Sequence, residues 1–488
     1  MALAALLATA VVQGAADEVV VMTSGAFTAP YLAAEPWFEK STGHSLVSMF
    51  GASTGGAADS IPSRLARGEP ADVIIVSAQA LDALSAAGEV EPGSRVDLVL
   101  SPIGMAVRAG APKPDIGSVD ALVRAVREAE SIAYSASVSG TYLATELFPR
   151  LGLADEIAKK GQRIEGERVG AVVARGDAEI GFQQISELKP IEGIDYVGPL
   201  PDEVQRVSTF SAGTAVGARS PDAARELIAF LRSPALGPVV EKYGLEQVGD
   251  EDWRVLFNGR DLAGWIVKIR GFEAGNNYAD TFRVTDGLLT VAYDGYDVFG
   301  DRFGHLFFAQ PFSHYRLRIE YRFVGAQAPN APSWATRNSG VMVHSQPPAT
   351  MARDQDFPIS IEVQFLGGLG DGRPRPTGNL CSPGTRVVYD GQPDASHCIQ
   401  AAAPTIDGDR WVTADVLVQG DGRIVHYIDG APVIEYEDVT YGGGNVNGHR
   451  PEDKPDGQPL AAGFIALQSE SHPIQFRRVE LLDLSDSR

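Results

Sequence analysis

The chain has 488 residues and a formal net charge of −22, with 44% hydrophobic and 21% charged residues. This apolar content lets each domain bury a core, which excludes global disorder, and the length predicts about two to four domains. The acidic balance argues against nucleic acid and anionic membrane surfaces as partners, because like charges repel. The 2 Cys exclude a disulfide-dense scaffold and a four-cysteine zinc site.

The N-terminal residues have the pattern of a secretory signal peptide. The apolar run Leu3–Val12 is followed by Gly14 and Ala16, at the −3 and −1 positions of a cleavage after Ala16. We therefore expect residues 1–16 to be removed on export, the alternative being a buried strand or helix segment. No later run reaches the ~18 apolar residues of a membrane span, so the mature protein is expected to be periplasmic or secreted.

Residues 17–249 alternate short β-branched runs with alanine-rich amphipathic segments, a pattern that predicts an α/β fold. The strands are expected at Val19–Met22, Ser45–Phe50 and Val73–Val76, and two helices at Val119–Ala129 and Asp222–Arg232. Both of these helices have acidic residues near their start and Arg near their end, as the helix dipole favours. The net charge is −11 in each half of the chain. The part up to Gly249 has 20 basic and 31 acidic residues, and the part after it has 21 basic and 32 acidic residues.

Three hydroxyl-rich clusters sit where strands of this half are expected to end and helices to begin: Thr23–Phe27, Gly51–Gly56 and Tyr134–Thr141. Free N–H groups at a helix start, helped by hydroxyls, bind an anion without a formal positive charge. Ordinary helix N-caps are the alternative. Three clusters together favour a binding site for a small anion or polar solute. The expected ligand-contacting residues are Ser24, Ser53, Thr54 and Ser137.

Four segments of this half resemble the solute-binding proteins of ABC importers, most closely the periplasmic molybdate-binding type: Phe38–Gly43, Phe50–Ser53, Gly68–Val73 and Ala174–Phe182. The resemblance implies two α/β lobes with the ligand between them and an ABC importer as partner. It also places Ser24 and Ser53 where that family contacts an oxyanion. Gln183–Ser186 replaces the usual aromatic-containing stretch, so another small anion or a polar organic ligand fits as well as molybdate.

Residues 250–488 predict an all-β sandwich or jelly roll. Tyr315–Phe323 alternates apolar and polar residues strictly, which is typical of a half-buried antiparallel strand. Trp411–Val418 and Arg423–Ile428 flank a Gly-Asp-Gly turn and predict a hairpin. Two Gly- and Pro-rich stretches are expected to be long loops that shape a site, namely Gly367–Pro383 and Gly442–Pro459.

Polar residues share one face of a predicted central strand in this half. In Ile359–Phe365, Glu362 and Gln364 alternate with apolar residues. A carboxylate beside an amide can bind sugar hydroxyls and move a proton. The alternative for Glu362 is a solvated outer face, but its apolar flanks indicate a central strand, where an unpaired carboxylate is costly. Asn338 and His344 are expected to share a face of a second such strand.

Five segments resemble the 3-keto-disaccharide hydrolase domain family, often labelled family 16 glycoside hydrolases: Leu256–Trp265, Asn338–Gly340, Glu362–Gln364, Gly463–Gln468 and His472–Arg477. The resemblance covers residues 250–488 and implies a concanavalin-like β-sandwich with a concave glycan-binding face. The retaining motif of family 16 itself puts Glu, Asp and Glu at alternate positions of one strand. Here Gln364 and Leu366 follow Glu362, so that double-carboxylate chemistry has no obvious residues.

The resemblance implies keto-sugar chemistry, which one carboxylate can support. A ketone at C3 acidifies the C2 hydrogen, a base removes it, the C1 glycoside leaves by β-elimination, and water adds back. We expect Glu362 to be the base or acid and His472 its proton partner. A divalent metal is an alternative stabiliser of the enolate, without a compact ligand motif to support it. The expected substrate-binding residues are Gln364, Asn338, Ser339, His344, Gln468 and Trp265, the last with core packing as its alternative.

Cys381 and Cys398 lie 17 positions apart in the long-loop region. In an exported protein they are expected to form one disulfide, which stabilises by roughly 3 kcal/mol. Two free thiols are the alternative and would fit a cytoplasmic protein.

The resulting hypothesis is an exported fusion of a two-lobed solute-binding domain, residues 17–249, and a jelly-roll domain, residues 250–488, that cleaves 3-keto-glycosides as a hydrolase or lyase. One alternative is a non-catalytic carbohydrate-binding module fused to an ABC-type solute receptor. The other is a conventional endo-β-glucanase.

Overall fold

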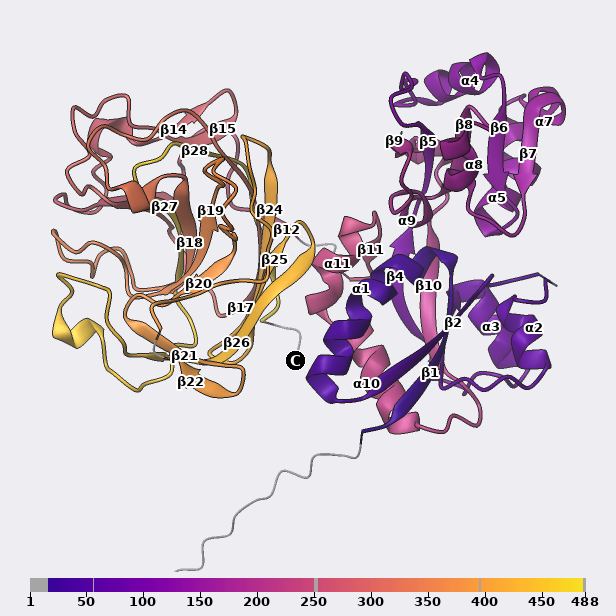
Figure 1. Cartoon of the computed structure of the whole chain (residues 1–488), viewed down its shortest axis with the longest axis horizontal. Coiled ribbons are helices and arrows are strands. Elements are labelled where there is room, and N and C mark those ends of the chain that lie inside the picture. Colours follow the sequence, from indigo (N-terminus) through magenta and orange to yellow (C-terminus); the bar gives the residue numbers. More distant parts are fainter. Residues whose placement is uncertain (1–15, 56, 250–252, 395, 486–488) are drawn as a thin grey trace, which may run out of the picture. The chain divides into compact units, whose positions relative to one another are not determined.

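The structure is a computed structural model, which describes residues 16–55, 57–249, 253–394 and 396–485. The chain divides into two compact units, Met1–Val248 (unit 1) and Gly249–Arg488 (unit 2), shown in Figure 1. The predicted signal peptide, residues 1–16, falls outside the described residues except for Ala16. Within the described ranges, no helix is both long enough and apolar enough to cross a membrane.

The first lobe of unit 1 is built on a six-stranded mixed sheet. Its strands are, in spatial order, β11 (Glu246–Gln247), β4 (Val96–Ser101), β10 (Ser208–Thr214), β3 (Val73–Ser77), β1 (Glu18–Ser24) and β2 (Ser45–Gly51). β1 runs parallel to β2 and β3, whereas β10 is antiparallel to β3 and β4. The strands predicted in this lobe are therefore confirmed, and every residue of the apolar β3 is buried.

Helices cover both faces of this sheet, since the sheet contributes apolar side chains to two separate cores. One face packs against α1 (Gly25–Thr42), α10 (Pro221–Arg232) and α11 (Gly237–Lys242). The other face packs against α2 (Ile61–Ala66) and α3 (Ala78–Ala86). The predicted helix that ends at Arg232 is α10.

The second lobe of unit 1 has a five-stranded sheet. Its strands are β7 (Gly161–Ile164), β6 (Ile132–Ser135), β8 (Ile180–Gln184), β5 (Ile103–Arg108) and β9 (Ile194–Pro199). Its α-helices are α4 (Val119–Glu128), α5 (Val138–Tyr142), α6 (Phe148–Arg150), α7 (Ala154–Lys160), α8 (Val169–Arg175) and α9 (Ile185–Leu188). Two segments join the lobes, Pro102 between β4 and β5 and residues 200–207 between β9 and β10. The predicted two-lobed α/β architecture is thus confirmed.

One hydroxyl cluster departs from its prediction. The Gly51–Gly56 segment does not begin a helix, because α2 begins only at Ile61. Its N-cap is Ser60, whose hydroxyl accepts a hydrogen bond from the backbone N–H of Ser63. The other two clusters do precede helices, α1 and α5, as predicted.

Unit 2 consists of two antiparallel sheets, as the alternating sequence predicts. The strands of the larger sheet are β14 (Phe282–Thr285), β15 (Leu288–Val291), β28 (Ile474–Asp483), β17 (His314–Phe323), β24 (Val412–Gln419), β25 (Ile424–Ile428), β26 (Ala431–Tyr441), β21 (Thr385–Tyr389) and β22 (Gln392–Asp394), with β12 (Trp253–Val255) also on β28. The strands of the smaller sheet are β13 (Trp265–Ile269), β16 (Gly304–Phe308), β27 (Phe464–Ser469), β18 (Asn338–Ser345), β19 (Ile361–Leu366), β20 (Asn379–Cys381) and β23 (Cys398–Ile399). The predicted hairpin is β24 and β25, which pair antiparallel.

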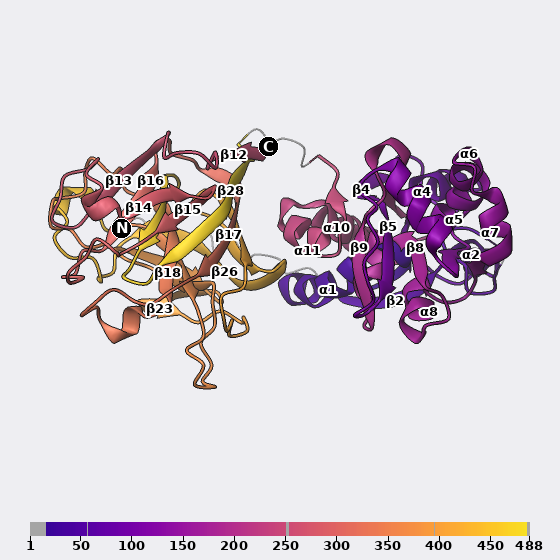
Figure 2. The same ribbon diagram turned by 90° about the horizontal axis from the view of Figure 1, so that it is seen from above.

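One hydrophobic core joins the two sheets, so unit 2 is a β-sandwich. Leu317 of β17 and Val363 of β19 belong to the same buried cluster. The long strands β17 and β28 run side by side (Figure 2). The opposite face of β17 was expected to be solvated, yet Arg316 is fully buried and ion-paired with Asp415. Trp253 covers the Arg316 guanidinium, with the ring centroid 5.0 Å away.

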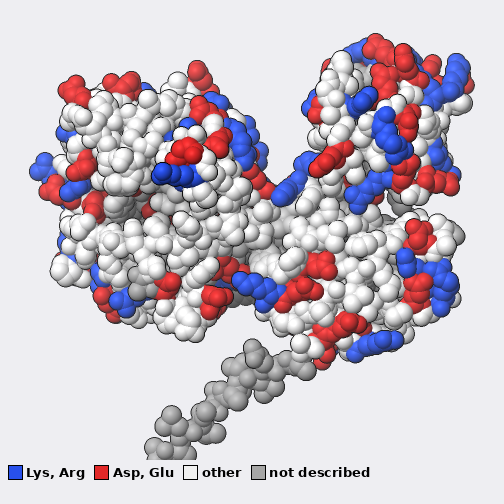
Figure 3. Space-filling view, viewed as in Figure 1, with Lys and Arg blue, Asp and Glu red and all other residues white. Residues whose placement is uncertain are grey.

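Charged side chains of both signs are intermixed on the face shown in Figure 3. Ion pairs between described residues are common; Arg95, for example, donates to both Asp82 and Asp97 at 2.8 Å. The net charge of −22 therefore does not gather in one acidic patch on that face.

Candidate functional site

The smaller sheet of unit 2 carries polar side chains on the face that points away from the shared core. In its register Glu362 lies opposite Met342 and Cys381, and His305 lies opposite Gln468. Strand alternation turns their neighbours in sequence, such as Val363, into the core. Antiparallel pairing thus brings a carboxylate, an imidazole and an amide from three strands onto one surface.

Glu362 is the most strongly perturbed of the predicted site residues. Its side chain is only 6% exposed, and burial raises the pKa of its carboxyl to about 8, with a smaller opposing effect from the nearby Gln468 amide. Oε1 has no hydrogen-bond partner. A Cβ atom at Gly340 would lie 2.9 Å from this oxygen, so the missing side chain of glycine makes room for the carboxylate.

A second carboxyl, Glu470, lies next to Glu362. Burial raises the pKa of Glu470 well above its usual range, and the charge of Glu362 raises it further, against a smaller lowering by Arg375. Two interacting buried carboxyls resist ionising together, so the pair keeps a proton at neutral pH. Sequence reasoning missed Glu470 as a site residue, because it follows the last residue of β27 and belongs to no alternating strand pattern.

Buried polar atoms without a partner gather around this pair. Most buried polar groups in a folded protein are hydrogen-bonded, so such a cluster marks a place where a polar ligand can bond. Both ring nitrogens of His305 are unpartnered, and burial lowers the pKa of this imidazole to about 3, which keeps it neutral. The other unpartnered atoms of the cluster belong to Gln468, Asn338, Glu362 and Glu470.

The structure brings four of the predicted residues onto one face, namely Glu362, Gln364, Asn338 and Gln468. Gln364 is already engaged, because its Oε1 accepts a hydrogen bond from Nδ2 of Asn379 at 3.0 Å. Gln468 and Asn338 are both buried, and each retains unpartnered side-chain atoms.

Three other predicted substrate contacts lie elsewhere. Trp265 is part of the core, and its indole N–H donates to the Leu256 carbonyl at 3.0 Å. The Ser339 hydroxyl donates to the Gln468 carbonyl at 2.9 Å, and strand alternation turns this side chain away from Glu362. His344 has a φ of 51° at an irregularity that ends the alternation of β18, and its Nε2 donates to the Gly420 carbonyl at 2.8 Å.

His472 follows Glu470 by two residues, and both of its ring nitrogens are buried without a hydrogen-bond partner. Its ring contacts Phe323 edge to face, with centroids 5.7 Å apart. Burial lowers its pKa to about 4, with Arg337 the next cause. The carboxyl that interacts with Glu362 is that of Glu470.

The predicted disulfide is confirmed: Cys381 and Cys398 are bonded across β20 and β23. Cys381 lies directly opposite Glu362 in the register of β19 and β20. The bond therefore fixes the strand that flanks the carboxyl pair.

Aromatic side chains lie at the margin of this surface. Phe357 contacts His305, with ring centroids 5.9 Å apart, and also Phe303 at 5.1 Å. Trp334 stacks on Phe303 at 5.8 Å and is 55% exposed. Trp334 is therefore an exposed aromatic ring that a row of ring contacts connects to His305.

The ranges that the structure describes contain no group of three or more His, Cys, Asp or Glu side chains placed to hold a metal ion.

In unit 1, serine side chains meet where three strands of the first lobe end. The Ser53 hydroxyl donates to Ser24 Oγ at 2.8 Å and accepts from the backbone N–H of Ser77 at 3.2 Å. Ser77 Oγ is buried without a partner. The structure thus brings Ser24 and Ser53 together at the start of α1, whereas the predicted Thr54 points into solvent.

The second lobe adds three more hydroxyls. Ser137 lies within hydrogen-bond distance of Ser135 and Ser139, at 2.7 and 3.3 Å. A Cβ atom at Gly140 would overlap the Ser135 carbonyl, so glycine lets the start of α5 approach the end of β6 closely.

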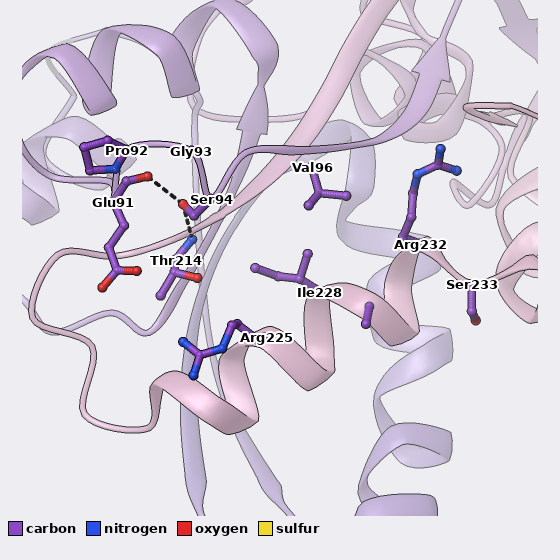
Figure 4. A pocket seen from close by; sticks show the side chains of 11 residues that line it. Glu91, Pro92, Gly93, Ser94, Val96, Thr214, Arg225, Ile228, Arg232 and Ser233 are labelled. Atoms are coloured by element: carbon purple, nitrogen blue, oxygen red, sulfur yellow. Dashed lines mark hydrogen bonds between the residues drawn. The ribbon is translucent and has the colours of Figure 1, made fainter. Parts of the chain in front are cut away.

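A separate surface groove of about 700 Å³ lies on the first lobe beside α10 (Figure 4). Two of its polar side chains already have partners: Ser94 donates to the Glu91 carbonyl and accepts from the Thr214 N–H, and Arg225 pairs with Asp222. The two serine clusters, Ser24, Ser53 and Ser77 in the first lobe and Ser135, Ser137 and Ser139 in the second, do not line it.

Each unit matches a family model. Residues 19–246 match the model of bacterial extracellular solute-binding proteins, and residues 252–482 match the 3-keto-alpha-glucoside-1,2-lyase-like domain. The chain is 45% identical over 251 residues to an aconitate isomerase from Pseudomonas sp., which spans 51% of this chain and 96% of that protein. It is 27% identical over 239 residues to a molybdate-binding protein from Azotobacter vinelandii, spanning 47% of this chain and 90% of that protein.

Among solved structures, the Azotobacter vinelandii periplasmic molybdate-binding protein matches with 20% identity and a TM-score of 0.39, covering 46% of this chain and 98% of that one. A putative glycosyl hydrolase from Parabacteroides distasonis matches with 17% identity and a TM-score of 0.30, covering 48% of this chain and 100% of that one.

The first half of the chain thus matches the bacterial extracellular solute-binding proteins, and the second half matches the 3-keto-alpha-glucoside-1,2-lyase-like domain. The chain is a fusion of the two.

Proposed function

We propose that unit 2 cleaves 3-keto-glycosides, with the carboxyls of Glu362 and Glu470 carrying the protons. The observation that carries this proposal is the pair itself: two buried, interacting carboxyls amid unpartnered polar atoms. The match to a domain described as 3-keto-alpha-glucoside-1,2-lyase-like supports the substrate class.

The chemistry needs one base and one acid. The ionised carboxyl removes the proton from C2, next to the C3 ketone, and the C–H electron pair forms the enolate. The enolate then expels the C1 oxygen, which takes a proton from the carboxyl that is still protonated. This step gives the enone and the free aglycone; addition of water to the enone completes a net hydrolysis, and its omission leaves a lyase.

Neighbouring groups can stabilise the enolate. Gln468 and Asn338 have buried amides with unpartnered atoms, and the neutral His305 can donate one ring N–H. Such preorganised donors act strongly in a site that excludes water.

The test is the release of phenol from an aryl 3-keto-glucoside by the whole chain, with release of glucose derivatives from 3-keto-trehalose as a second substrate. A carbohydrate-binding module would bind but release nothing. A conventional endoglucanase would instead hydrolyse unoxidised β-glucan.

We infer a second activity for unit 1, the isomerisation of an unsaturated polycarboxylate of the aconitate type. The specific observation in its favour is the 45% identity to a named aconitate isomerase over 96% of that protein. We assign this likeness to unit 1, whose length fits the 251 matched residues and whose serines suit a carboxylate. The alternative is a receptor that delivers a small anion to an ABC importer.

Two measurements separate these alternatives for unit 1. Interconversion of cis- and trans-aconitate, followed by NMR, supports the isomerase. Calorimetric binding of molybdate without any interconversion supports the receptor.

We also propose that the protein is exported to the periplasm or secreted. The family of extracellular solute-binding proteins and the disulfide support this location. Recovery of the protein in an osmotic-shock fraction, with a mature N-terminus at residue 17, tests it.

A further inference from the structure

Unit 1 contains a buried carboxyl that neither the serine clusters nor the family match explains. Glu187 lies on α9 of the second lobe, yet a Cβ atom at Gly25, the first residue of α1 in the first lobe, would overlap its Oε1. Only glycine at residue 25 lets the carboxyl approach this closely. Glu187 therefore reaches from one lobe to the start of a helix in the other, and its side chain is 9% exposed.

The start of α1 is a place where a negative charge is stabilised. Its first turn contains no acidic residue, and the Ser24 side chain does not cap it, because that hydroxyl accepts from Ser53. An 18-residue helix presents free N–H groups and a partial positive charge at this end. The charged group that acts on Glu187 is Arg168, next to α8, and the Gln183 amide also faces it.

Helix capping alone does not account for this arrangement. A carboxylate whose function is to cap a helix is stabilised in its ionised form. Burial instead raises the pKa of Glu187 to about 7, so both protonation states are populated near neutral pH. Two further hydroxyls are buried without partners: Ser186, which precedes Glu187, and Ser77, whose backbone N–H joins the Ser24 and Ser53 cluster.

We propose that Glu187 is the group that removes and returns the proton when unit 1 isomerises its substrate. This inference rests on the isomerase activity proposed above. The substrate class is an alkene with carboxylates and a CH2–carboxylate arm, whose anionic ends would be held by the serine hydroxyls, the start of α1 and Arg168.

The step balances without a further reactant. The Glu187 carboxylate takes a proton from the saturated CH2 carbon; a C–H bond breaks and an O–H bond forms. The electron pair spreads over the three allylic carbons and the attached carboxylates. The same carboxyl then returns the proton to the former alkene carbon, so the double bond moves by one carbon and re-forms with the other geometry.

The first experiment compares Glu187→Gln with wild type and with Glu192→Gln, an exposed neighbour on the same lobe. Glu187→Gln is expected to lower the rate of aconitate interconversion at least about 100-fold, the size of effect typical for loss of an acid–base group. Calorimetry should show that it still binds trans-aconitate, and Glu192→Gln should keep the wild-type rate. Wild-type turnover in Glu187→Gln would overturn the assignment.

A second experiment needs no variant. Wild-type protein is given aconitate with a CD2 methylene, and the product is examined by NMR. Proton transfer predicts that one deuteron leaves that carbon, to the other allylic carbon or to water. Product that still carries an intact CD2 group would overturn the inference. If wild type interconverts neither isomer, the isomerase proposal itself fails, whatever the variants show.

Discussion

Gly340 and Glu362 lie diagonally across β18 and β19, and a Cβ atom at residue 340 would come 2.9 Å from Oε1 of Glu362. The position of the carboxylate thus depends on the absence of a side chain on the neighbouring strand.

Gly340→Ala should displace the Glu362 carboxyl without unfolding unit 2. We expect the cleavage of an aryl 3-keto-glucoside to fall at least about tenfold, because displacements of a catalytic group of ~1 Å cost one to two orders of magnitude. Gly444→Ala is the matched control, since a Cβ atom there meets nothing within 4 Å. Equal activity of both variants would show that the carboxylate position does not matter.

The raised pKa of Glu362 predicts how stability changes with pH. The folded protein holds the Glu362 proton more tightly than the unfolded chain does. Proton binding by Glu362 therefore contributes to the free energy of unfolding at low pH. This contribution is lost as pH rises from the usual carboxyl pKa through about 8. The free energy of unfolding should therefore fall over this range by up to about 1.4 kcal/mol per pH unit for a single group.

Glu362→Gln removes this titration. The variant should be more stable than wild type at pH 9 and have a flatter profile, measured by urea denaturation between pH 5 and pH 9. Parallel profiles for the two proteins would contradict the assignment of the raised pKa to Glu362.

Trp334→Ala tests whether the exposed ring holds the sugar. Loss of the aromatic surface should raise KM about tenfold, equivalent to ~1.4 kcal/mol of binding, and leave kcat within about twofold. Trp265→Phe is the contrasting variant, because it removes a buried hydrogen bond and core volume. It should lower the melting temperature and leave KM unchanged; the reverse pattern would restore Trp265 as the sugar contact.

Replacing Cys381 and Cys398 by Ser should destabilise unit 2 by roughly 3 kcal/mol through loop entropy. Because Cys381 lies opposite Glu362, the cleavage rate should fall as well. The measurements are the unfolding free energy and the release assay below the new melting temperature. An unchanged melting temperature would mean that the loop is held by other contacts.

Much of the fold could be predicted from the sequence because both halves have strong periodicity. The strict alternation of Tyr315–Phe323 and the continuous apolar run of Val73–Val76 each became the expected strand. The predictions failed where the alternation itself is broken. The positive φ of His344 interrupts the regular pairing of β18, and the amino-acid types in this segment do not predict that irregularity.

The candidate sites were less predictable, since they depend on contacts between distant segments. Glu470 approaches Glu362 only because β27 and β19 both flank β18. Glu187 and Gly25 are 162 positions apart, and the two lobes must fold before they meet. In neither case does the local sequence pattern mark the carboxyl as buried.

The role proposed for the Glu362 and Glu470 carboxyls is tested most directly by the release of phenol from an aryl 3-keto-glucoside by wild type, Glu362→Gln and Glu470→Gln. We expect release by wild type and a loss of at least about 100-fold in each variant, because the chemistry needs both a base and an acid. Glu320→Gln, on β17 of the other sheet, is the control and should keep the wild-type rate. Full release by either carboxyl variant, or none by wild type, would contradict the assignment of this pair.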